Sequence, residues 1–157
     1  MNKVAVNAEG IPLPSWSGAI CNFAMKVLEK INRDNWELSI LLCGNETITE
    51  LNSRYRNKPE PTDILSFNLG AQMQDGDKPV YLPGDIVISL ETMGENAEYF
   101  QISPDEELRR LIIHGILHLD GMDHKTNEKN EPMLVLQEEI LNKLGSEYII
   151  PNGGTSK

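Results

Sequence analysis

The sequence predicts an α/β (α+β) fold, in which a small mixed sheet of about four strands packs with helices in a single domain. Short apolar stretches of strand length alternate along the chain with longer segments of helical periodicity. A length of 157 residues suits one domain with a sizeable core. We therefore expect residues 1–149 to form this domain and the polar end at residues 150–157 to be a disordered tail.

The first half of the chain contains three expected strands and two expected helices. The strands are short stretches of apolar residues, and the helices carry apolar residues on one face at helical spacing. In chain order they are a strand at 4–8, a helix at 14–32, a strand at 36–44, a helix at 45–57 and a strand at 63–69. Gly44 ends the second strand, and Asn45 can cap the helix that follows.

The second half adds one strand and three helices. It contains, in order, a loop at 70–84 that is rich in Gly, Asp and Pro, a strand at 85–89, and helices at 90–101, 103–121 and 131–144. The helix at 103–121 has the clearest start, because Ser103 can cap it, Pro104 suits its first position and Glu106 completes a capping box. Gly121 suits its end, since glycine readily adopts the left-handed conformation found there.

The net charge of −10 argues against a protein that coats naked nucleic acid, because such binding needs many Lys and Arg contacts with phosphates. A small site that grips one or two phosphates is compatible with this charge. No apolar run reaches the about 18 residues that span a membrane, and residues 1–10 lack the features of a secretory signal. Cys21 and Cys43 lack metal-type spacing and are expected to be reduced thiols. These observations predict a cytoplasmic protein with no membrane partner.

All three histidines of the chain lie in one segment, HGILHLDGMDH, which runs from His114 to His124. His114 and His118 are four residues apart on an expected helix, so both imidazoles project from one face about one turn apart. Gly121 lets the chain turn back, and His124 can then supply a third ligand. Three nitrogen ligands with an open fourth position are typical of a catalytic zinc site on a zincin-like helix. We predict one zinc ion per chain, although other divalent metals such as nickel, cobalt or manganese also suit imidazole ligands.

Gly115 stands where an HExxH protease has the glutamate that acts as its general base. Hydrolysis of peptides would then need a base from elsewhere, such as Asp85 or Asp123. Attack on a phosphodiester instead generates charge on phosphoryl oxygens, which a metal and a guanidinium can stabilise. Gly115 is expected to serve either helix–strand packing or substrate access. Asp120 and Asp123 either orient a histidine or are solvated carboxylates.

The densest basic stretch of the chain contains Arg54, Arg56 and Lys58, just before the strand at 63–69. Arginine can clamp a phosphate through two parallel hydrogen bonds. Cations at the C-terminal end of a helix are also favoured by the helix dipole, with no ligand involved. The residues alone leave both interpretations open.

The segments HGILHLDGMDH, YRNKPEPTDILSF and GDIVIS together resemble the YbeY family of bacterial metal-dependent endoribonucleases, the ribosomal RNA maturation factors. The histidine segment matches the family motif H-G-x-L-H-L-x-G-x-D-H throughout. The resemblance implies that His114, His118 and His124 hold the metal and that Arg56 is the functionally important arginine. One departure is Asn68, where the family often has proline, and we expect it to alter a loop and not the chemistry.

The resemblance further implies cleavage of single-stranded RNA in 3′-end maturation of small-subunit ribosomal RNA, and a role in ribosome quality control. Metal-activated water or a metal-polarised phosphate would act with Arg56, which would stabilise the transition state, so that residues 1–149 form a catalytic metal-hydrolase domain. Ribosomal proteins or ribosome-associated GTPases could deliver the substrate to such an acidic enzyme, and DNA is not an expected partner. Two other functions stay open: a metalloprotease or amidase with a base from elsewhere, and a non-enzymatic ribosome assembly factor with a structural metal.

Overall fold

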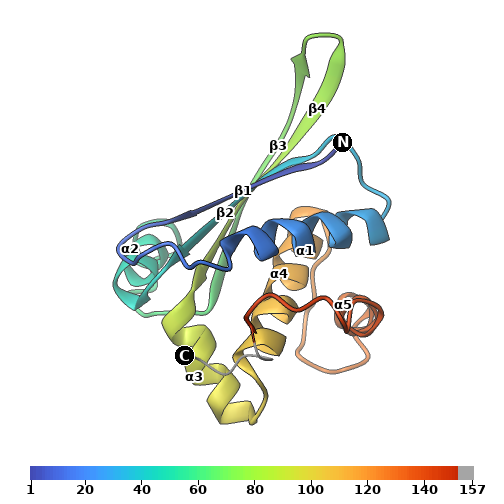
Figure 1. Cartoon of the computed structure of the whole chain (residues 1–157). Coiled ribbons are helices and arrows are strands. Elements are labelled where there is room, and N and C mark those ends of the chain that lie inside the picture. The colour runs from blue at the N-terminus through green and yellow to red at the C-terminus, as the bar shows by residue number, and fades with distance from the viewer. Residues whose placement is uncertain (152–157) are drawn as a thin grey trace.

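A four-stranded mixed sheet with helices against both of its faces forms the body of the molecule (Figure 1). The computed structural model describes residues 1–151. Its elements are, in chain order, β1 (Lys3–Ala8), α1 (Ser17–Lys30), β2 (Glu37–Cys43), α2 (Asn45–Arg56), β3 (Ile64–Asp75), β4 (Lys78–Ser89), α3 (Leu90–Phe100), α4 (Pro104–Leu119) and α5 (Pro132–Lys143). The expected α/β (α+β) architecture with four strands is confirmed.

The strands lie in the order β1-β2-β4-β3. β1 and β2 are parallel, as are β2 and β4, whereas β3 and β4 form an antiparallel hairpin. Side chains of β2 alternate between two apolar clusters. Leu38, Ile40 and Leu42 belong to the main core, while Leu41 and Cys43 belong to a smaller cluster together with α2. The middle of the sheet is therefore covered on both faces, which explains why β2 is a continuous apolar run.

Helix α4 is the central helix of the main core, with 11 of its 16 residues buried. It contacts α1, α3, α5 and the hairpin strands, and Figure 1 shows α1 in front of it and α5 beside it. Its expected start is confirmed, because Ser103 Oγ accepts a hydrogen bond from the Glu106 N–H at 3.0 Å. The Glu106 carboxylate pairs with Arg110 at 2.9 Å instead of completing a capping box. After the helix, Gly121 has a φ of 97° and lets the chain turn back.

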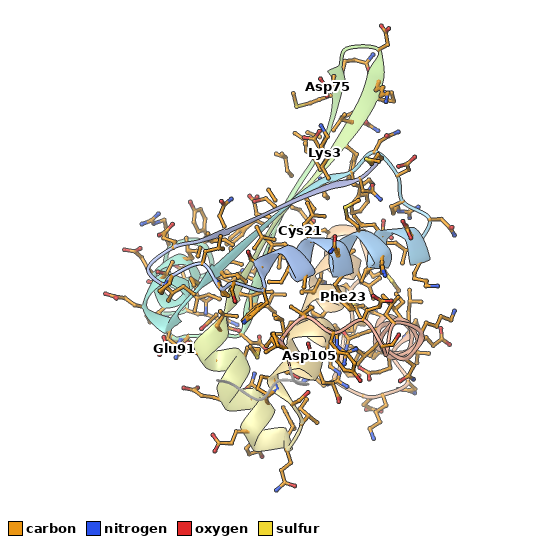
Figure 2. The ribbon with its side chains drawn as sticks, in the orientation of Figure 1. Lys3, Cys21, Phe23, Asp75, Glu91 and Asp105 are labelled. Carbon is orange, nitrogen blue, oxygen red and sulfur yellow. The ribbon has the colours of Figure 1, made fainter. Side chains whose placement is uncertain are left out.

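The prediction of a loop at 70–84 is wrong, because these residues extend β3 and β4 into one long hairpin. Its two-residue turn places Gly76 at a φ of 68°, which is the conformation that a tight hairpin turn requires. From Lys78 to Gly84, β4 pairs with β3 on one side and has an isolated bridge from Tyr81 to Trp36 on the other, and such an edge tolerates proline. The hairpin projects away from the helices, with Asp75 near its tip (Figures 1 and 2).

An irregularity between Asn68 and Ala71 interrupts the hairpin ladder where it leaves the body. Gly84 pairs with Asn68 there and has a φ of 136°. A β-carbon on Gly84 would overlap the carbonyl oxygen of Phe67, so only glycine fits. Asn68 therefore lies in a strand at a bulge, and not in a loop as its departure from the family pattern had suggested.

The C-terminal segment of the described chain packs against the start of α4. Ile149 and Ile150 are buried, and both backbone N–H groups donate to Asp105 Oδ1, at 2.7 and 2.8 Å. Packed chain thus continues through Ile150, the first residue of the expected tail, whereas residues 152–157 of that tail lie outside the described residues.

Cys21 and Cys43 are both free, as expected. Burial raises the pKa of the Cys43 thiol to about 11, so it stays protonated at neutral pH. Within residues 1–151, no helix has the length and apolar character needed to cross a membrane.

Candidate functional site

The three histidines meet at the C-terminal end of α4. His114 and His118 lie one turn apart on the helix, and His124 approaches them after the chain has turned at Gly121. One ligand atom of each imidazole lies within 4.8 Å of the others. The ring centroids of His114 and His118 are 4.5 Å apart, and His124 lies 5.4 and 5.8 Å from the two. The spacing that predicted the cluster therefore does bring these side chains together.

Each histidine ring uses Nδ1 for a hydrogen bond within the protein. His118 Nδ1 lies 3.0 Å from the carbonyl oxygen of Met122, and His124 Nδ1 lies 2.8 Å from that of Thr126. A carbonyl oxygen only accepts, so both rings carry their proton on Nδ1 and keep the lone pair of Nε2 for another partner. A metal ligand needs this arrangement, since the second nitrogen fixes the orientation of the ring.

His114 obtains its Nδ1 partner from α5. Gln137 Oε1 lies 2.7 Å from His114 Nδ1, and the Gln137 side chain is itself buried. The Gln137 amide nitrogen donates to Glu138 Oε2 at 3.1 Å, which fixes the other end of the amide as the acceptor. Arg110 holds Glu138 through Nε at 2.9 Å and Nη2 at 3.2 Å. A chain of polar contacts thus sets the tautomer of His114 as well.

Burial lowers the pKa of His114 below its ordinary value, and the nearby rings of His118 and His124 act in the same direction. The hydrogen bond with Gln137 opposes this shift. The neutral imidazole, which is the form that binds a metal, is therefore favoured at neutral pH.

Gly115 faces the sheet. A β-carbon at this position would lie 2.9 Å from Ile86 Cδ1 and 3.1 Å from Ile64 Cδ1. Of the two expected roles, the structure supports helix–strand packing. A glutamate at this position would have to push aside the Ile86 and Ile64 side chains, and the glycine that stands here supplies no general base. Asp85 offers no substitute, because it lines a separate cavity with Tyr55 near α2.

A cleft of about 450 Å³ opens beside the histidines. Its walls come from β3, the end of α4 and the end of α2, and its lining includes Arg56, Ser66, Asn68, His114, His118 and Asp123. The exposed Arg56 reaches across and donates from Nη2 to the Ser66 carbonyl oxygen at 2.9 Å. Its guanidinium carbon also lies 5.9 Å from the centre of the Phe67 ring.

The neighbouring basic residues differ from Arg56. Arg54 pairs with Glu50 at 4.0 Å on the exposed side of α2, and neither Arg54 nor Lys58 lines the cleft. Of the three residues in the basic stretch, only Arg56 is therefore brought to the histidines. Its contact with a backbone carbonyl leaves other N–H donors of the guanidinium for an anion.

Asp120 and Asp123 flank the cluster but do not hydrogen bond to a histidine ring. Asp120 forms a two-pronged ion pair with Arg33, at 2.6 and 3.2 Å. Asp123 Oδ1 accepts the backbone N–H of His124 at 2.8 Å, which fixes the loop that carries His124. Gln137, which orients the His114 ring through its side chain, was missed, because this contact joins positions 23 residues apart.

Comparisons with known proteins identify the family to which the chain is similar. A family model described as endoribonuclease YbeY matches residues 7–145. Endoribonuclease YbeY of Treponema pallidum strain Nichols is 46% identical over 142 residues, covering 90% of this chain and 89% of the relative. Endoribonuclease YbeY of Borrelia turicatae is 44% identical over 135 residues, covering 85% and 89%. The solution structure of TM1509 from Thermotoga maritima is 27% identical and has a TM-score of 0.61, covering 98% of this chain and 97% of that one.

Proposed function

The chain belongs to the endoribonuclease YbeY family, whose members are phosphodiester hydrolases, and from this premise we propose that it matures the 3′ end of small-subunit ribosomal RNA and serves ribosome quality control. The single catalytic metal-hydrolase domain proposed for this activity is residues 1–149. Membership in the family makes the chain an enzyme, so the assembly-factor and protease hypotheses are set aside. The observation that carries the detailed proposal is the shared cleft of Arg56 with two of the histidines.

We propose that His114, His118 and His124 hold one zinc ion. Three imidazoles that keep Nε2 unused and Nδ1 bonded are the donor set of an open catalytic zinc site. When bound there, zinc would supply Lewis-acid chemistry, which makes water more acidic and a phosphoryl oxygen more electrophilic. Other divalent metals suit the same ligands, and metal affinity measured by chelator competition would rank them.

Arg56 is the proposed catalytic residue. Its guanidinium lies in the cleft, and the Ser66 carbonyl and the Phe67 ring hold it in position. A pre-positioned guanidinium stabilises the charge that develops on phosphoryl oxygens during attack, and a bidentate contact would do so best. Lysine would keep the charge but lose the fork of donors. Arg56→Lys should therefore retain little of the rate.

The nucleophile is either water or the 2′-hydroxyl of the RNA, and the two leave different ends. A cyclic phosphate product requires the 2′-hydroxyl to attack, whereas direct hydrolysis leaves none. Single-stranded RNA is the proposed substrate, because an open cleft of this size accepts a flexible backbone. End analysis of the products would assign the attacking group.

A net charge of −10 leaves the protein poorly suited to capture long RNA on its own. We propose that ribosomal proteins or ribosome-associated GTPases deliver the RNA to it, and that DNA is not a substrate. Because the proposed substrate is ribosomal, the proposed place of action is the cytoplasm. Tight binding of the isolated protein to long naked RNA that persists at high salt would contradict the need for delivery.

The test is cleavage of an end-labelled RNA with a single-stranded 3′ overhang by metal-loaded protein. His118→Ala, purified in parallel and checked for folding by circular dichroism, is the matched control. We expect cleavage by the wild type, none by the variant, and recovery when zinc is added back to chelated wild type. Equal cleavage by both proteins would indicate a contaminating nuclease. If neither protein cleaves this RNA or ribosomal particles, the proposal fails.

A further inference from the structure

A second groove continues the metal cleft on the side away from Arg56. It has a volume of about 430 Å³ and lies between the end of α4, the segment before β2 and the outer hairpin. Asn68 and Gly121 line both cavities, so the two lie side by side. Volumes of about 300–1,000 Å³ are typical of small-ligand sites. The groove is therefore large enough for one further unit of a chain that already occupies the cleft.

Arg33 forms one wall of this groove, and Asp120 holds it in place. Nε of Arg33 donates to Asp120 Oδ1 at 2.6 Å and Nη2 donates to Oδ2 at 3.2 Å. Within the described residues, no hydrogen bond of the structure uses Nη1. The side chain of Arg33 is 43% exposed, whereas that of Asp120 is 15% exposed. Asp120 thus orients the guanidinium, and the Nη1 donors stay available to an anion.

The opposite part of the groove is aromatic and apolar. Tyr81 packs against Trp36 with ring centroids 5.1 Å apart, which fixes its position, and remains partly exposed. Leu69, which lines the same groove, is 63% exposed and adds apolar surface to it. An amphipathic ring beside an exposed leucine is a surface on which a nucleobase can stack.

We propose that this groove is a second nucleotide subsite, in which Arg33 contacts a phosphate and Tyr81 with Leu69 contacts the base next to it. This inference rests on the proposed function, because it assigns the path of the RNA that the metal cleft would cut. The strand would run from Arg56 past the histidines to Arg33. The two guanidiniums would then contact phosphates on opposite sides of the histidine cluster.

The pairing of Arg33 with Asp120 suits this path in an acidic protein. The ion pair neutralises a carboxylate that would otherwise repel a phosphate at the edge of the histidine cluster. It also spares Arg33 the loss of side-chain freedom when RNA binds, since the guanidinium is already held. A protein segment would use the apolar part of the groove as well, but it would not need the anion contact at Arg33.

The experiment compares RNA oligonucleotides that are lengthened one nucleotide at a time on the 5′ or the 3′ side of the cleaved bond. Binding is measured by fluorescence anisotropy with metal-loaded protein, and KM by cleavage. The variants are Arg33→Gln/Asp120→Asn, which removes both charges together, and Tyr81→Ser. The control is Lys26→Gln/Glu147→Gln, which removes an exposed ion pair of 2.8 Å between α1 and the segment after α5 and leaves the groove intact.

We expect lengthening on one side only to improve wild-type affinity, roughly tenfold for the nucleotide that reaches the groove. This advantage should fall to about onefold in both groove variants and persist in the control. The slope of log affinity against log salt should decrease by about 0.7 in the Arg33 variant alone, as expected for one lost phosphate contact on a single strand. An equal advantage in wild type and groove variants would overturn the proposal.

The two proposals fail in different ways. If the wild type never cleaves RNA, the proposed function fails, and the length dependence of binding still decides whether the groove holds a nucleotide. If the wild type cleaves RNA but neither KM nor affinity depends on nucleotides beyond the metal cleft, the groove is not a subsite while the proposed function stands. The same anisotropy experiment can use an apolar peptide in place of RNA. If the peptide binds the wild type and this binding is lost in Tyr81→Ser alone, the groove belongs to a protein partner and the nucleotide subsite is overturned.

Discussion

The two ends of α4 both place polar side chains against the protein, and they use them in opposite ways. At the N-terminal end, Asp105, which is labelled in Figure 2, is fully buried. Its Oδ2 pairs with Arg109 at 2.8 Å, and its Oδ1 accepts the N–H groups of Ile149 and Ile150. At the C-terminal end, each histidine has one nitrogen bonded within the protein and leaves the other facing its neighbours.

This difference separates a structural polar site from one built for a ligand. A buried polar group with every partner inside the protein contributes to a unique fold, because its loss leaves the other partners unsatisfied. A group with one satisfied side and one open side is oriented and still available. Variants at the two ends of the helix should therefore have opposite effects. A variant at the N-terminal end should lose stability and keep its metal affinity, whereas a variant at the C-terminal end should lose metal affinity and keep its stability.

Asp105→Ala should produce the largest loss of stability. It leaves the buried Arg109 guanidinium without its carboxylate and two backbone N–H groups without an acceptor. We expect the free energy of unfolding to fall by about 3–5 kcal/mol, measured by urea denaturation. Asp105→Asn is the matched control, since it keeps an acceptor for Ile149 and Ile150 and loses only the charge. If Asp105→Ala reduced the free energy of zinc binding by more than it reduced the free energy of unfolding, the distinction between the two ends would be lost.

Gln137→Leu tests the C-terminal end. The change removes the acceptor of His114 Nδ1–H and leaves a side chain of similar size in the same buried position. Loss of such a supporting contact typically weakens metal binding about 10–100-fold. We expect this loss in chelator competition, with a smaller change in the melting temperature of the metal-free protein.

The control for this change is Gln137→Glu, which restores an acceptor and should restore zinc affinity. A purely packing role for Gln137 predicts instead that leucine preserves zinc affinity and that glutamate, with a buried charge, lowers it. The ranking of the three proteins in metal affinity therefore decides between the two roles, and the melting temperatures alone would not.

The sequence predicts the histidine cluster well because its geometry is local. Residues four apart on a helix share a face, and a glycine allows the return of the chain, so spacing alone brings His114, His118 and His124 together. Gln137 carries no such signal, since the packing of α5 on α4 decides its contact. Arg56 stands between these cases. Composition did not distinguish it from Arg54, and only the resemblance to a family selected it.

The hairpin shows why a correct list of strands still missed part of the fold. Residues 70–84 are rich in Gly, Asp and Pro, which usually interrupt strands, and in a sequence Gly76 looks like one more interruption. The same glycine is what a two-residue hairpin turn needs. Prolines such as Pro79 are tolerated because the outer half of β4 is an edge, and edge position depends on which strands pair.

Gly115→Ala should have a moderate effect, and it tests how closely the metal end of α4 depends on packing. The new β-carbon would lie 2.9 Å from Ile86 Cδ1. Overpacking typically costs about 1–3 kcal/mol, and the better helix propensity of alanine offsets about 1 kcal/mol of it. We expect a net loss of up to about 2 kcal/mol in thermal or urea unfolding.

Ile86→Val removes the atom nearest to the new β-carbon, Ile86 Cδ1, so it is the natural second variant. In the double variant Gly115→Ala/Ile86→Val, the two changes should compensate, and the double-mutant cycle should show a favourable coupling. Simple additivity would mean that the contact with Ile86 Cδ1 does not limit the residue at position 115. Cleavage by the double variant would then separate packing from substrate access directly.

The smallest effect concerns Glu107, a buried carboxyl in the N-terminal half of α4. Burial raises the pKa of Glu107 above its ordinary value of 4.5, and the nearby Arg110 only partly opposes this shift. The folded protein therefore holds this proton to a higher pH than the unfolded chain does. Between the unfolded and folded pKa values the folded state binds more protons, so the free energy of unfolding falls as the pH rises through this window.

Glu107→Gln removes this titration and keeps a side chain of the same shape beside Arg110. Relative to the wild type, the variant should therefore gain stability as the pH rises from about 4.5 toward neutrality, measured by urea unfolding at several pH values. Because both proteins share every other titrating group, their difference isolates Glu107. A difference that stays constant with pH would show that burial does not raise the pKa of Glu107 in the folded protein.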